Sequence, residues 1–510
     1  MFSSYLLAFL TGFLSLGLEI LWVRLFSFAN HSLPQAFAFV LMCYLVGIAL
    51  GAQIGRKCCN SAKNLWVVSG VILLTSSVFD LVSPFIYAKS VNLYQNQILV
   101  GAYMITLAAL LKSILFPIVH QLGAAKAKLN FGHAISKVYV SNILGATLGP
   151  VFIGLFLLNL FTTQQCFIIC AGLSFLVGIY CLITYVQPIL ILTAILFVLV
   201  FQNVVLTIHP HWLITEIAMI NDKKHNIRQV VENGNGIITT YQSADGDIIY
   251  GSNVYDGRTN LNPIINSNGI DRVIMLSAIQ DKPKNVLMIG LSVGSWLALI
   301  NTFPGVEKID VVEINPGYLD VIKNYPQQLQ ALTDPRVHIF FDDGRRWLGF
   351  HPQNKYDLII MNTTFHWRAY ASNLLSKEFL TMMKQHMNPN AVIAFNTTQS
   401  LDAFKTANSV FTHAYLNQTF VVAADFDWRK KLHTEAAIKK LASLRLDGKL
   451  LYPAGSEKII HSYLNKPMKT FDVAADFNTI FSLLFNANSK IEIVTDKNLI
   501  TEYKHGEMLF

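Results

Sequence analysis

The chain has 510 residues, of which 53% are hydrophobic and only 14% are charged. This composition is too apolar for a purely soluble protein of this length. The net charge of +8 comes almost wholly from residues 1–207, which hold nine of the 39 basic residues but two of the 31 acidic ones. The remainder is therefore nearly neutral, which argues against nucleic acid as a partner.

Long apolar stretches dominate the first part of the chain. A helix that crosses a bilayer needs about 20 apolar residues. Seven stretches meet this length, at roughly 5–28, 35–55, 65–87, 98–121, 135–160, 164–186 and 188–207. The first could be a signal peptide, but it lacks a basic leading segment and a small-residue cleavage site, and more spans follow, so we expect it to be a span. We therefore expect a multi-pass integral membrane protein, with the lipid bilayer as a partner and a bacterial inner membrane as its location.

Basic residues in the loops indicate the orientation of the spans. The second and fourth loops carry most of them, at positions 56–63 and 126–137. The positive-inside rule then places these loops and the N-terminus in the cytoplasm. With seven spans, everything after residue 207 would lie on the outer side of the membrane.

A few polar residues fall inside or near the predicted spans. Glu19 and Arg24 lie close together in the first span, which suggests an ion pair within the bundle, an interfacial arginine, or a path for a ligand or proton. Lys112 lies near a span end, where we expect it to reach the interface. The segment "GATLG", Gly145 to Gly149, predicts close packing of two helices.

Beyond residue 207 the chain reads as two regions. Residues 208–282 alternate β-forming residues with turn residues, and "SADGD" predicts a hairpin turn. From residue 283 onwards, strands alternate with helices, which predicts a doubly wound sheet. The expected organisation is a transmembrane domain over 1–207, a small β-rich region over 208–282 and an α/β Rossmann domain over 283–510.

Polar residues mark the ends of the predicted strands, where an open α/β sheet binds its ligands. The first strand runs into a glycine turn, and the second ends at Glu313, an acid placed to bind ribose hydroxyls. An acid after the third strand can accept a hydrogen bond from an exocyclic amine such as adenine N6. The sequence therefore predicts a cofactor site formed by Gly290, Gly294, Glu313, Asp343 and Gly344.

The fourth strand, Tyr356 to Met361, stops at the polar segment "NTTFHWR". Three side chains of this segment are candidate catalytic residues: Asn362, His366 and Arg368. A histidine can serve as a base near neutral pH, and an arginine favours an anionic group. The simpler alternative is that Asn362 and the two following threonines cap a helix. An amphipathic helix is expected next, ending near Pro389.

The sequence resembles the membrane-fused form of the spermidine synthase (polyamine aminopropyltransferase) family over nearly its whole length. The matching segments are "GFLSLGLEILWVRLFSF", "LVGIALGAQIGRK", "SNILGATLGP", "DIIYGSNVYDG", "VLMIGLSVGS", "VVEIN", "DPRVHIFFDDGRRWL" and "KYDLIIMN". The resemblance implies a methyltransferase-like Rossmann domain that uses decarboxylated S-adenosylmethionine or S-adenosylmethionine, without a metal. It assigns Glu313 to the ribose and Asp343 to the adenine.

The sequence departs from the family pattern at its other acids. The acid that holds the aminopropyl end of the cofactor is replaced by Val293, and the catalytic acid by Asn362. A second acid falls near Phe365, and the tyrosine and other polar residues of the family's gate fall at Arg272 and Val273. An amide orients an amine but does not accept its proton. Transfer to a polyamine is therefore in question, whereas the nucleoside half of the site is kept.

Three functions stay open from the sequence. The first is a membrane-anchored transferase that moves an aminopropyl or methyl group to an unknown small-molecule acceptor. The second is a catalytically inactive membrane protein whose domain binds a nucleoside or a partner. The third, a transporter with a regulatory domain, is the weakest because the spans carry few charges. Adenosyl cofactors are cytoplasmic, so the first function conflicts with an odd number of spans. Formation of a homo-oligomer is left open.

Overall fold

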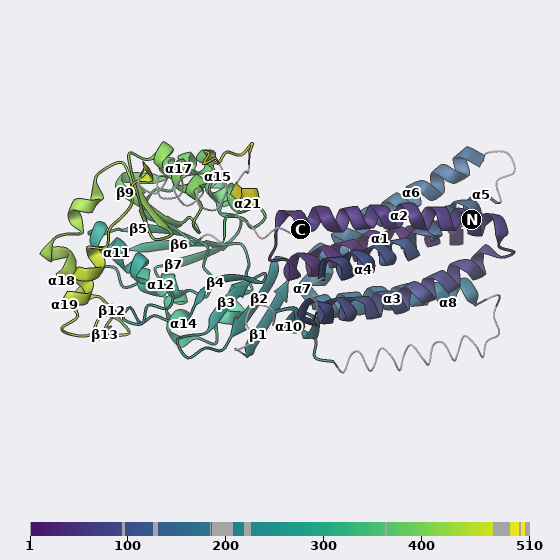
Figure 1. Cartoon of the computed structure of the whole chain (residues 1–510), viewed down its shortest axis with the longest axis horizontal. Coiled ribbons are helices and arrows are strands. Elements are labelled where there is room, and N and C mark those ends of the chain that lie inside the picture. Colours follow the sequence, from purple (N-terminus) through teal and green to yellow (C-terminus); the bar gives the residue numbers. More distant parts are fainter. Residues whose placement is uncertain are drawn as a thin grey trace. The chain divides into compact units, whose positions relative to one another are not determined.

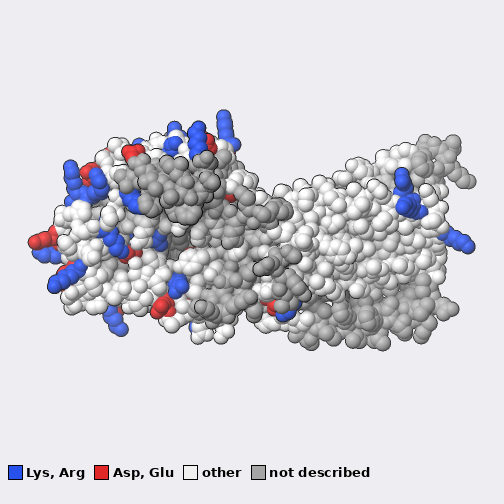
Figure 2. Space-filling model, in the orientation of Figure 1, with Lys and Arg blue, Asp and Glu red and all other residues white. Residues whose placement is uncertain are grey.

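The computed structural model describes residues 2–93, 97–125, 131–183, 185, 208–218, 226–362, 365–472, 490–498 and 501–504. The chain forms two compact units (Figure 1). The helical unit consists of Met1–Lys224, Glu232–Ile237 and Leu509–Phe510, and the α/β unit of His225–Val231 and Ile238–Met508. Figure 2 shows side chains of both charge signs over the α/β unit and few charges on the visible face of the helical unit.

The helical unit contains long apolar helices. Its main elements are α1 (Phe2–Ala29), α2 (Pro34–Ser61), α3 (Leu65–Leu93), α4 (Gln97–Ser113), α5 (Leu115–Ala124), α6 (Phe131–Phe152) and α8 (Thr163–Leu182). Among the described residues, six segments are long and apolar enough to cross a membrane: Ser3–Ala29, Pro34–Ser61, Leu65–Asn92, Gln97–Ala124, Gly132–Leu160 and Thr163–Leu182. They correspond to the first six predicted spans. The seventh predicted span, 188–207, lies outside the described residues.

Small residues allow α1 and α6 to pack closely. A Cβ atom on Gly145 would overlap the carbonyl oxygen of Phe9, and one on Gly149 would overlap that of Phe13. Only glycine lets the two backbones approach this far. The packing role predicted for "GATLG" is confirmed.

A buried ion pair joins α3 and α4 in the helical unit. The ammonium group of Lys112 contacts the Asp80 carboxylate and donates to Ser76 Oγ at 2.9 Å. Lys112 is only 4% exposed, so the prediction that it reaches the interface is wrong. The reason is that Asp80 and Ser76 of α3 bind the ammonium group inside the unit, a contact that the sequence does not show.

Arg24 pairs with a residue that follows it by about two hundred positions. Its Nη2 lies 4.0 Å from Glu232 Oε2, and its Nε donates to Thr163 Oγ1 at 2.9 Å. Glu232 lies near the end of β1 (Ile227–Asn233), in the stretch that clusters with the helices. Arg24 therefore takes part in an ion pair, but its partner is neither Glu19 nor any residue of a span.

A small sheet precedes the Rossmann-like part of the chain. It contains β1, β2 (Gly236–Tyr241), β3 (Ile248–Gly251) and β4 (Val254–Arg258), in that order. The pairs β2–β3 and β3–β4 are antiparallel. The segment "SADGD" lies in the connection between β2 and β3, as its turn residues predict.

The large sheet has seven strands in the order β10-β11-β9-β8-β5-β6-β7. The central strands β5 to β9 are parallel, and β11 is antiparallel to both of its neighbours. Strand order reverses at β5, which is the point where open α/β sheets bind ligands. The strands are β5 (Asn285–Ile289), β6 (Lys308–Glu313), β7 (Val337–Phe341), β8 (Tyr356–Met361), β9 (Met387–Asn396), β10 (His413–Asn417) and β11 (Phe420–Ala424).

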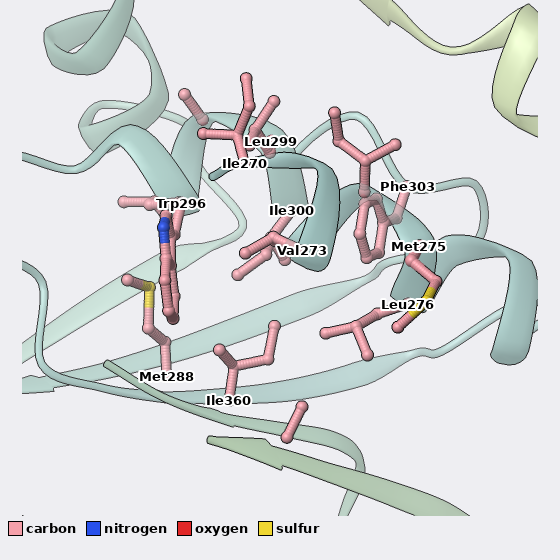
Figure 3. Close-up of a cluster of buried hydrophobic side chains, with 14 of the residues drawn as sticks. Ile270, Val273, Met275, Leu276, Met288, Trp296, Leu299, Ile300, Phe303 and Ile360 are labelled. Atoms are coloured by element: carbon pink, nitrogen blue, oxygen red, sulfur yellow. The ribbon is translucent and has the colours of Figure 1, made fainter. Parts of the chain in front are cut away.

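Helices cover both faces of this sheet because side chains of each strand alternate between two cores. In β5, Val286 and Met288 join one core, and Leu287 and Ile289 join the other. Figure 3 shows part of the first core, which includes Trp296 and Ile360. That core takes side chains from α11 (Asp271–Ile279), α12 (Ser295–Ile300), α13 (Tyr318–Ile322), α14 (Pro326–Leu332), α18 (Glu435–Ser443) and α19 (Glu457–Leu464). The second core takes them from α15 (Gly344–Phe350), α16 (Lys377–Gln385) and α17 (Leu401–Val410).

The predicted helix before Pro389 is shorter than expected. It ends at Gln385, and Pro389 lies inside β9 instead. The ladder between β8 and β9 shifts register between Tyr356 and Leu358, so β9 contains extra residues near its start. A proline is tolerated in a sheet at such an irregularity, because no regular hydrogen bond is lost there.

A candidate nucleoside site at the strand ends

The carboxyl ends of the parallel strands meet at one edge of the large sheet. The backbone N–H of Gly290, just after β5, donates to Val312 O at 2.9 Å. The N–H of Asn362, just after β8, donates to Ile289 O at 2.8 Å. The structure therefore brings the glycine turn, Glu313 at the end of β6 and Asn362 together at the switch point.

The glycine turn needs its first glycine for steric reasons. Gly290 has a φ of +86°, and a Cβ atom there would lie 2.6 Å from the carbonyl oxygen of Asn362. Ser292 in the same turn has a φ of +50°, a strained value for a residue with a side chain. Such strain is concentrated at functional sites, where the surrounding structure holds it in place.

Glu313 is the central acid of the site. It is 4% exposed, and its two oxygens accept hydrogen bonds from Leu291 N at 2.6 Å and Asn315 N at 2.8 Å. Burial raises the pKa of Glu313 to about 7, the nearby Asp256 raises it further, and the backbone hydrogen bonds lower it. Each carboxylate oxygen has a second lone pair, so the pair can also accept from two ribose hydroxyls.

Asp343 and Gly344 lie at the start of α15, one strand further along. Asp343 is half-buried and caps the helix by accepting from Arg346 N at 2.8 Å. A Cβ atom on Gly344 would lie 2.7 Å from Ile289 Cγ2, so this glycine lets α15 pack against β5. Both positions have structural roles, and a contact of Asp343 with adenine stays a prediction.

The candidate catalytic residues after β8 occupy different surroundings. Asn362 lines a cavity at the strand ends. His366 is 3% exposed, and its Nδ1 lies 2.9 Å from Thr398 Oγ1. Burial lowers the pKa of the Arg368 guanidinium, and the nearby Tyr318, Asp256 and Glu313 oppose this shift. Arg368 thus lies within electrostatic reach of the acids of the site.

The helix-capping alternative for Asn362 does not match the structure. The next helical turn that the structure describes is η2 (Ala371–Leu374), with Tyr370 at its N-cap position. Asn362 is too far from that turn to cap it. The two threonines, Thr363 and Thr364, lie outside the described residues.

A small cavity of about 210 Å³ adjoins the strand ends. It is lined by Tyr255, Asp256, Gly257, Asn268, Arg272, Trp296, Asn362, Phe365, Asn396, Thr398, Gln399 and Thr419. An adjoining hollow shares Asp256 and Asn362 with it and is also lined by Val293. Three of the positions that depart from the family pattern, Arg272, Asn362 and Phe365, therefore line the cavity, and Val293 lines the hollow beside it.

Asp256 is a functional candidate that the sequence does not single out. Its Oδ2 accepts a hydrogen bond from Tyr318 OH at 2.5 Å. Burial raises the pKa of Asp256, whereas hydrogen bonds from Tyr318 and Ser292 and the charge of Arg368 lower it. The segment "YDG" is typical of a turn, and only the placement of β4 beside the glycine turn reveals that this acid faces the cavity.

The sheet order and the glycine turn at the switch point define a Rossmann-type α/β domain. A family model, "Spermine/spermidine synthase domain", matches residues 271–424. The C-terminal region of this chain therefore contains a spermidine synthase-like domain. Among the described residues, no group of three or more His, Cys, Asp or Glu side chains is placed to hold a metal ion.

Individual relatives agree with this assignment over shorter stretches. The polyamine aminopropyltransferase of Alkaliphilus oremlandii is 39% identical over 103 residues, which cover 20% of this chain and 36% of the relative. The polyamine aminopropyltransferase of Clostridium perfringens is 44% identical over 82 residues, which cover 16% of this chain and 29% of the relative. The chain thus covers about a third of the length of these relatives.

Two further similarities cover more of the chain. The polyamine aminopropyltransferase of Saccharolobus solfataricus is 26% identical over 213 residues, which cover 38% of this chain and 70% of the relative. The crystal structure of a spermidine synthase in complex with the transition state analogue AdoDATO is also similar. The match covers 47% of this chain and 85% of the spermidine synthase chain, at 18% identity and a TM-score of 0.39.

Proposed function

We propose that this chain is a membrane-anchored transferase of the spermidine synthase type that binds S-adenosylmethionine or its decarboxylated form. The observation that supports the proposal is the buried Glu313 carboxylate, held by two backbone N–H groups at the switch point of the sheet. This is where a ribose binds in a Rossmann-type fold. Asp343 is proposed to contact the adenine.

The cavity beside this site is the proposed place of the acceptor. When bound, the sulfonium of an adenosyl cofactor supplies an electrophilic carbon. An acceptor amine that bonds to this carbon displaces the thioether sulfur, which keeps the electron pair of the broken C–S bond, and the amine releases one proton. Asp256 is the only carboxylate that lines the cavity among the described residues, and its raised pKa suits it to accept that proton.

The residues after β8 complete the proposed site. The Asn362 amide lines the cavity and is placed to orient the acceptor by hydrogen bonding. Arg368 interacts with Asp256 and Glu313, so it balances the charge of the two acids. His366 is held by Thr398 and does not line the cavity, so we propose that it positions the loop after β8.

A noncatalytic role in binding a nucleoside or a partner is the second candidate. It is favoured by the neutral side chains of Val293, Asn362 and Phe365 where the resembled family has acids. Calorimetric titration of the full chain in detergent with methylthioadenosine and S-adenosylmethionine tests what the two candidates share. Release of methylthioadenosine or S-adenosylhomocysteine in the presence of acceptor amines then separates them.

Replacing Asp256 with asparagine is expected to lower the rate of transfer by about a hundredfold or more, because the proton acceptor is lost. The affinity for methylthioadenosine is expected to stay nearly unchanged, since Glu313 is intact. Asp320→Asn, an exposed aspartate paired with Lys323, is the matched control. Transfer by Asp256→Asn at the wild-type rate would remove Asp256 as the base.

The membrane side of the domain gives an independent test. Six spans and a cytoplasmic N-terminus would bring the C-terminal domain to the cytoplasm, where adenosyl cofactors are found. A reporter fused to the C-terminus is expected to be active in the cytoplasm. An exported reporter would contradict a transferase that depends on these cofactors.

A further inference from the structure

The charged groups of the 210 Å³ cavity indicate which class of acceptor it takes. We propose that the acceptor is a small zwitterion, with its amine beside Asp256 and a carboxylate bound to Arg272, rather than a polyamine. The inference rests on the proposed function, because it names the acceptor of the same site. It also goes beyond that function, since nothing in the nucleoside half of the site requires an acceptor of this kind.

Two hydrogen bonds fix the Arg272 guanidinium in a position to bind a carboxylate. Its Nε donates to Gly269 O at 2.9 Å, and its Nη1 donates to Thr419 Oγ1 at 3.0 Å. Its guanidinium carbon lies 5.5 Å from the centre of the Phe420 ring and 6.0 Å from that of Trp296. Nη2 donates to no group among the described residues. A planar guanidinium fixed in this way is well suited to bind a carboxylate.

The described lining of the cavity offers one carboxylate to pair with an ammonium group. Asp256 is the only acid among the described lining residues, and it already interacts with Tyr318 and Arg368. A polyamine has at least two ammonium groups. The second would have no carboxylate to pair with and would share the small cavity with the positive charge of Arg272.

The rest of the lining is uncharged. Three side chains are aromatic (Tyr255, Trp296 and Phe365), and the others are amides, threonines and a glycine. The Tyr255 hydroxyl interacts most strongly with Arg258, which lines the adjoining hollow, and it also lies within electrostatic reach of Arg272 and Asp256, which both line the cavity. A short apolar chain between an amine and a carboxylate matches this distribution.

Three four-carbon amines that differ in one terminal group test the inference. The full chain, in detergent and saturated with methylthioadenosine, is titrated with 4-aminobutanoate, 1,4-diaminobutane and butylamine by calorimetry. We expect 4-aminobutanoate to bind at least about tenfold more tightly than 1,4-diaminobutane, and butylamine to bind more weakly than 4-aminobutanoate. Equal or tighter binding of the diamine would overturn the inference.

Variants of Arg272 show whether this residue provides the preference. Arg272→Gln is expected to weaken 4-aminobutanoate binding about tenfold or more and to leave butylamine nearly unchanged. Arg445→Gln, an exposed arginine of β12 (Arg445–Leu446), is the matched control. If Arg272→Gln also loses methylthioadenosine, Arg272→Lys decides, because it keeps the charge: a retained preference for 4-aminobutanoate supports the inference and a lost preference overturns it.

The same experiment separates this inference from the proposed function. Failure of the wild-type chain to bind methylthioadenosine would contradict the proposed function itself. Normal binding of methylthioadenosine with no preference for the carboxylated ligand would contradict only the class of acceptor.

Discussion

Replacing Glu313 with glutamine is expected to weaken the binding of methylthioadenosine by roughly a hundredfold, since hydrogen bonds to a charged group contribute about 1.5–3 kcal/mol each. The amide has only one acceptor oxygen. It would leave Leu291 N or Asn315 N without an acceptor and would face the ribose with an N–H donor. Calorimetry on the full chain measures the loss.

Glu307→Gln is the matched control for this substitution. Glu307 is exposed and pairs with Lys284 at 3.0 Å. It lies just before β6, at the end of the strand opposite to the candidate site. Its replacement is expected to leave the affinity for the nucleoside unchanged. Wild-type affinity in Glu313→Gln, with an unchanged melting temperature, would show that the ribose binds elsewhere.

We expect the binding of methylthioadenosine to depend on pH, because Glu313 titrates. Only the ionised form of Glu313 accepts from both ribose hydroxyls, and its pKa is raised to about 7 by burial. The affinity for methylthioadenosine should therefore fall about tenfold from pH 8 to pH 6, and this slope should disappear in Glu313→Gln. An affinity that rises as the pH falls would contradict the assignment.

The sign is opposite for the stability of the unliganded chain. Because the pKa of Glu313 is raised on folding, the protonated carboxyl stabilises the fold, and this contribution is lost as the pH rises through about 7. Methylthioadenosine binds the ionised form, so it should raise the melting temperature more at pH 8 than at pH 6. A larger rise at pH 6 would contradict this account of Glu313.

Replacing Glu232 with alanine is expected to destabilise the chain by about 3–5 kcal/mol, because it leaves Arg24 buried without its acid. The Glu232 side chain is 1% exposed, and it accepts from Thr163 N at 2.9 Å and lies 2.8 Å from His211 Nδ1. Burial alone raises the pKa of Glu232, but His211, Arg24 and Thr163 together lower it. This stabilisation is therefore present above the ordinary pKa of a glutamate and is lost as the pH falls through the lowered value.

Thermal unfolding of the full chain in detergent measures this effect against a matched control. Glu435→Ala breaks an ion pair with Lys439 in which the two side chains are 89% and 80% exposed, and it should cost at most about 1 kcal/mol. The double variant Arg24→Met/Glu232→Leu should be more stable than Glu232→Leu alone, because no charge is left unpaired. Equal melting temperatures for Glu232→Ala and Glu435→Ala would show that the buried pair contributes little.

The apolar helices and the strands of the large sheet were accessible to sequence analysis. Uninterrupted apolar stretches predicted the six described segments that are long enough to cross a membrane. Strand β8 begins and ends at the predicted residues, Tyr356 and Met361. Both patterns depend on local composition, so they need no knowledge of distant contacts. The exception is Lys112, whose burial depends on its pair with Asp80 of another helix.

The grouping of residues at the candidate nucleoside site was also predictable, because parallel strands carry their end residues to a common edge. Gly290, Glu313 and Asn362 follow this rule. The acceptor side was not predictable in the same way. Asp256 belongs to a separate antiparallel sheet, and its partner Tyr318 lies in α13, so their meeting depends on how β4 packs against the glycine turn.

Arg24 shows the same limit in the helical unit. Its place in the first span suggested an ion pair within the helical bundle, but a guanidinium pairs with whichever acid the tertiary structure brings beside it. That acid, Glu232, comes from a strand far along the sequence. Local spacing carries no information about such a contact.

A structure of the full chain bound to methylthioadenosine tests the central claim most directly. We predict that the two ribose hydroxyls donate to the Glu313 carboxylate and that the adenine lies beside Asp343. We also predict that the thioether sulfur faces the cavity lined by Asp256 and Asn362. A nucleoside bound away from Glu313, or no nucleoside at the strand ends at saturating concentration, would contradict the account.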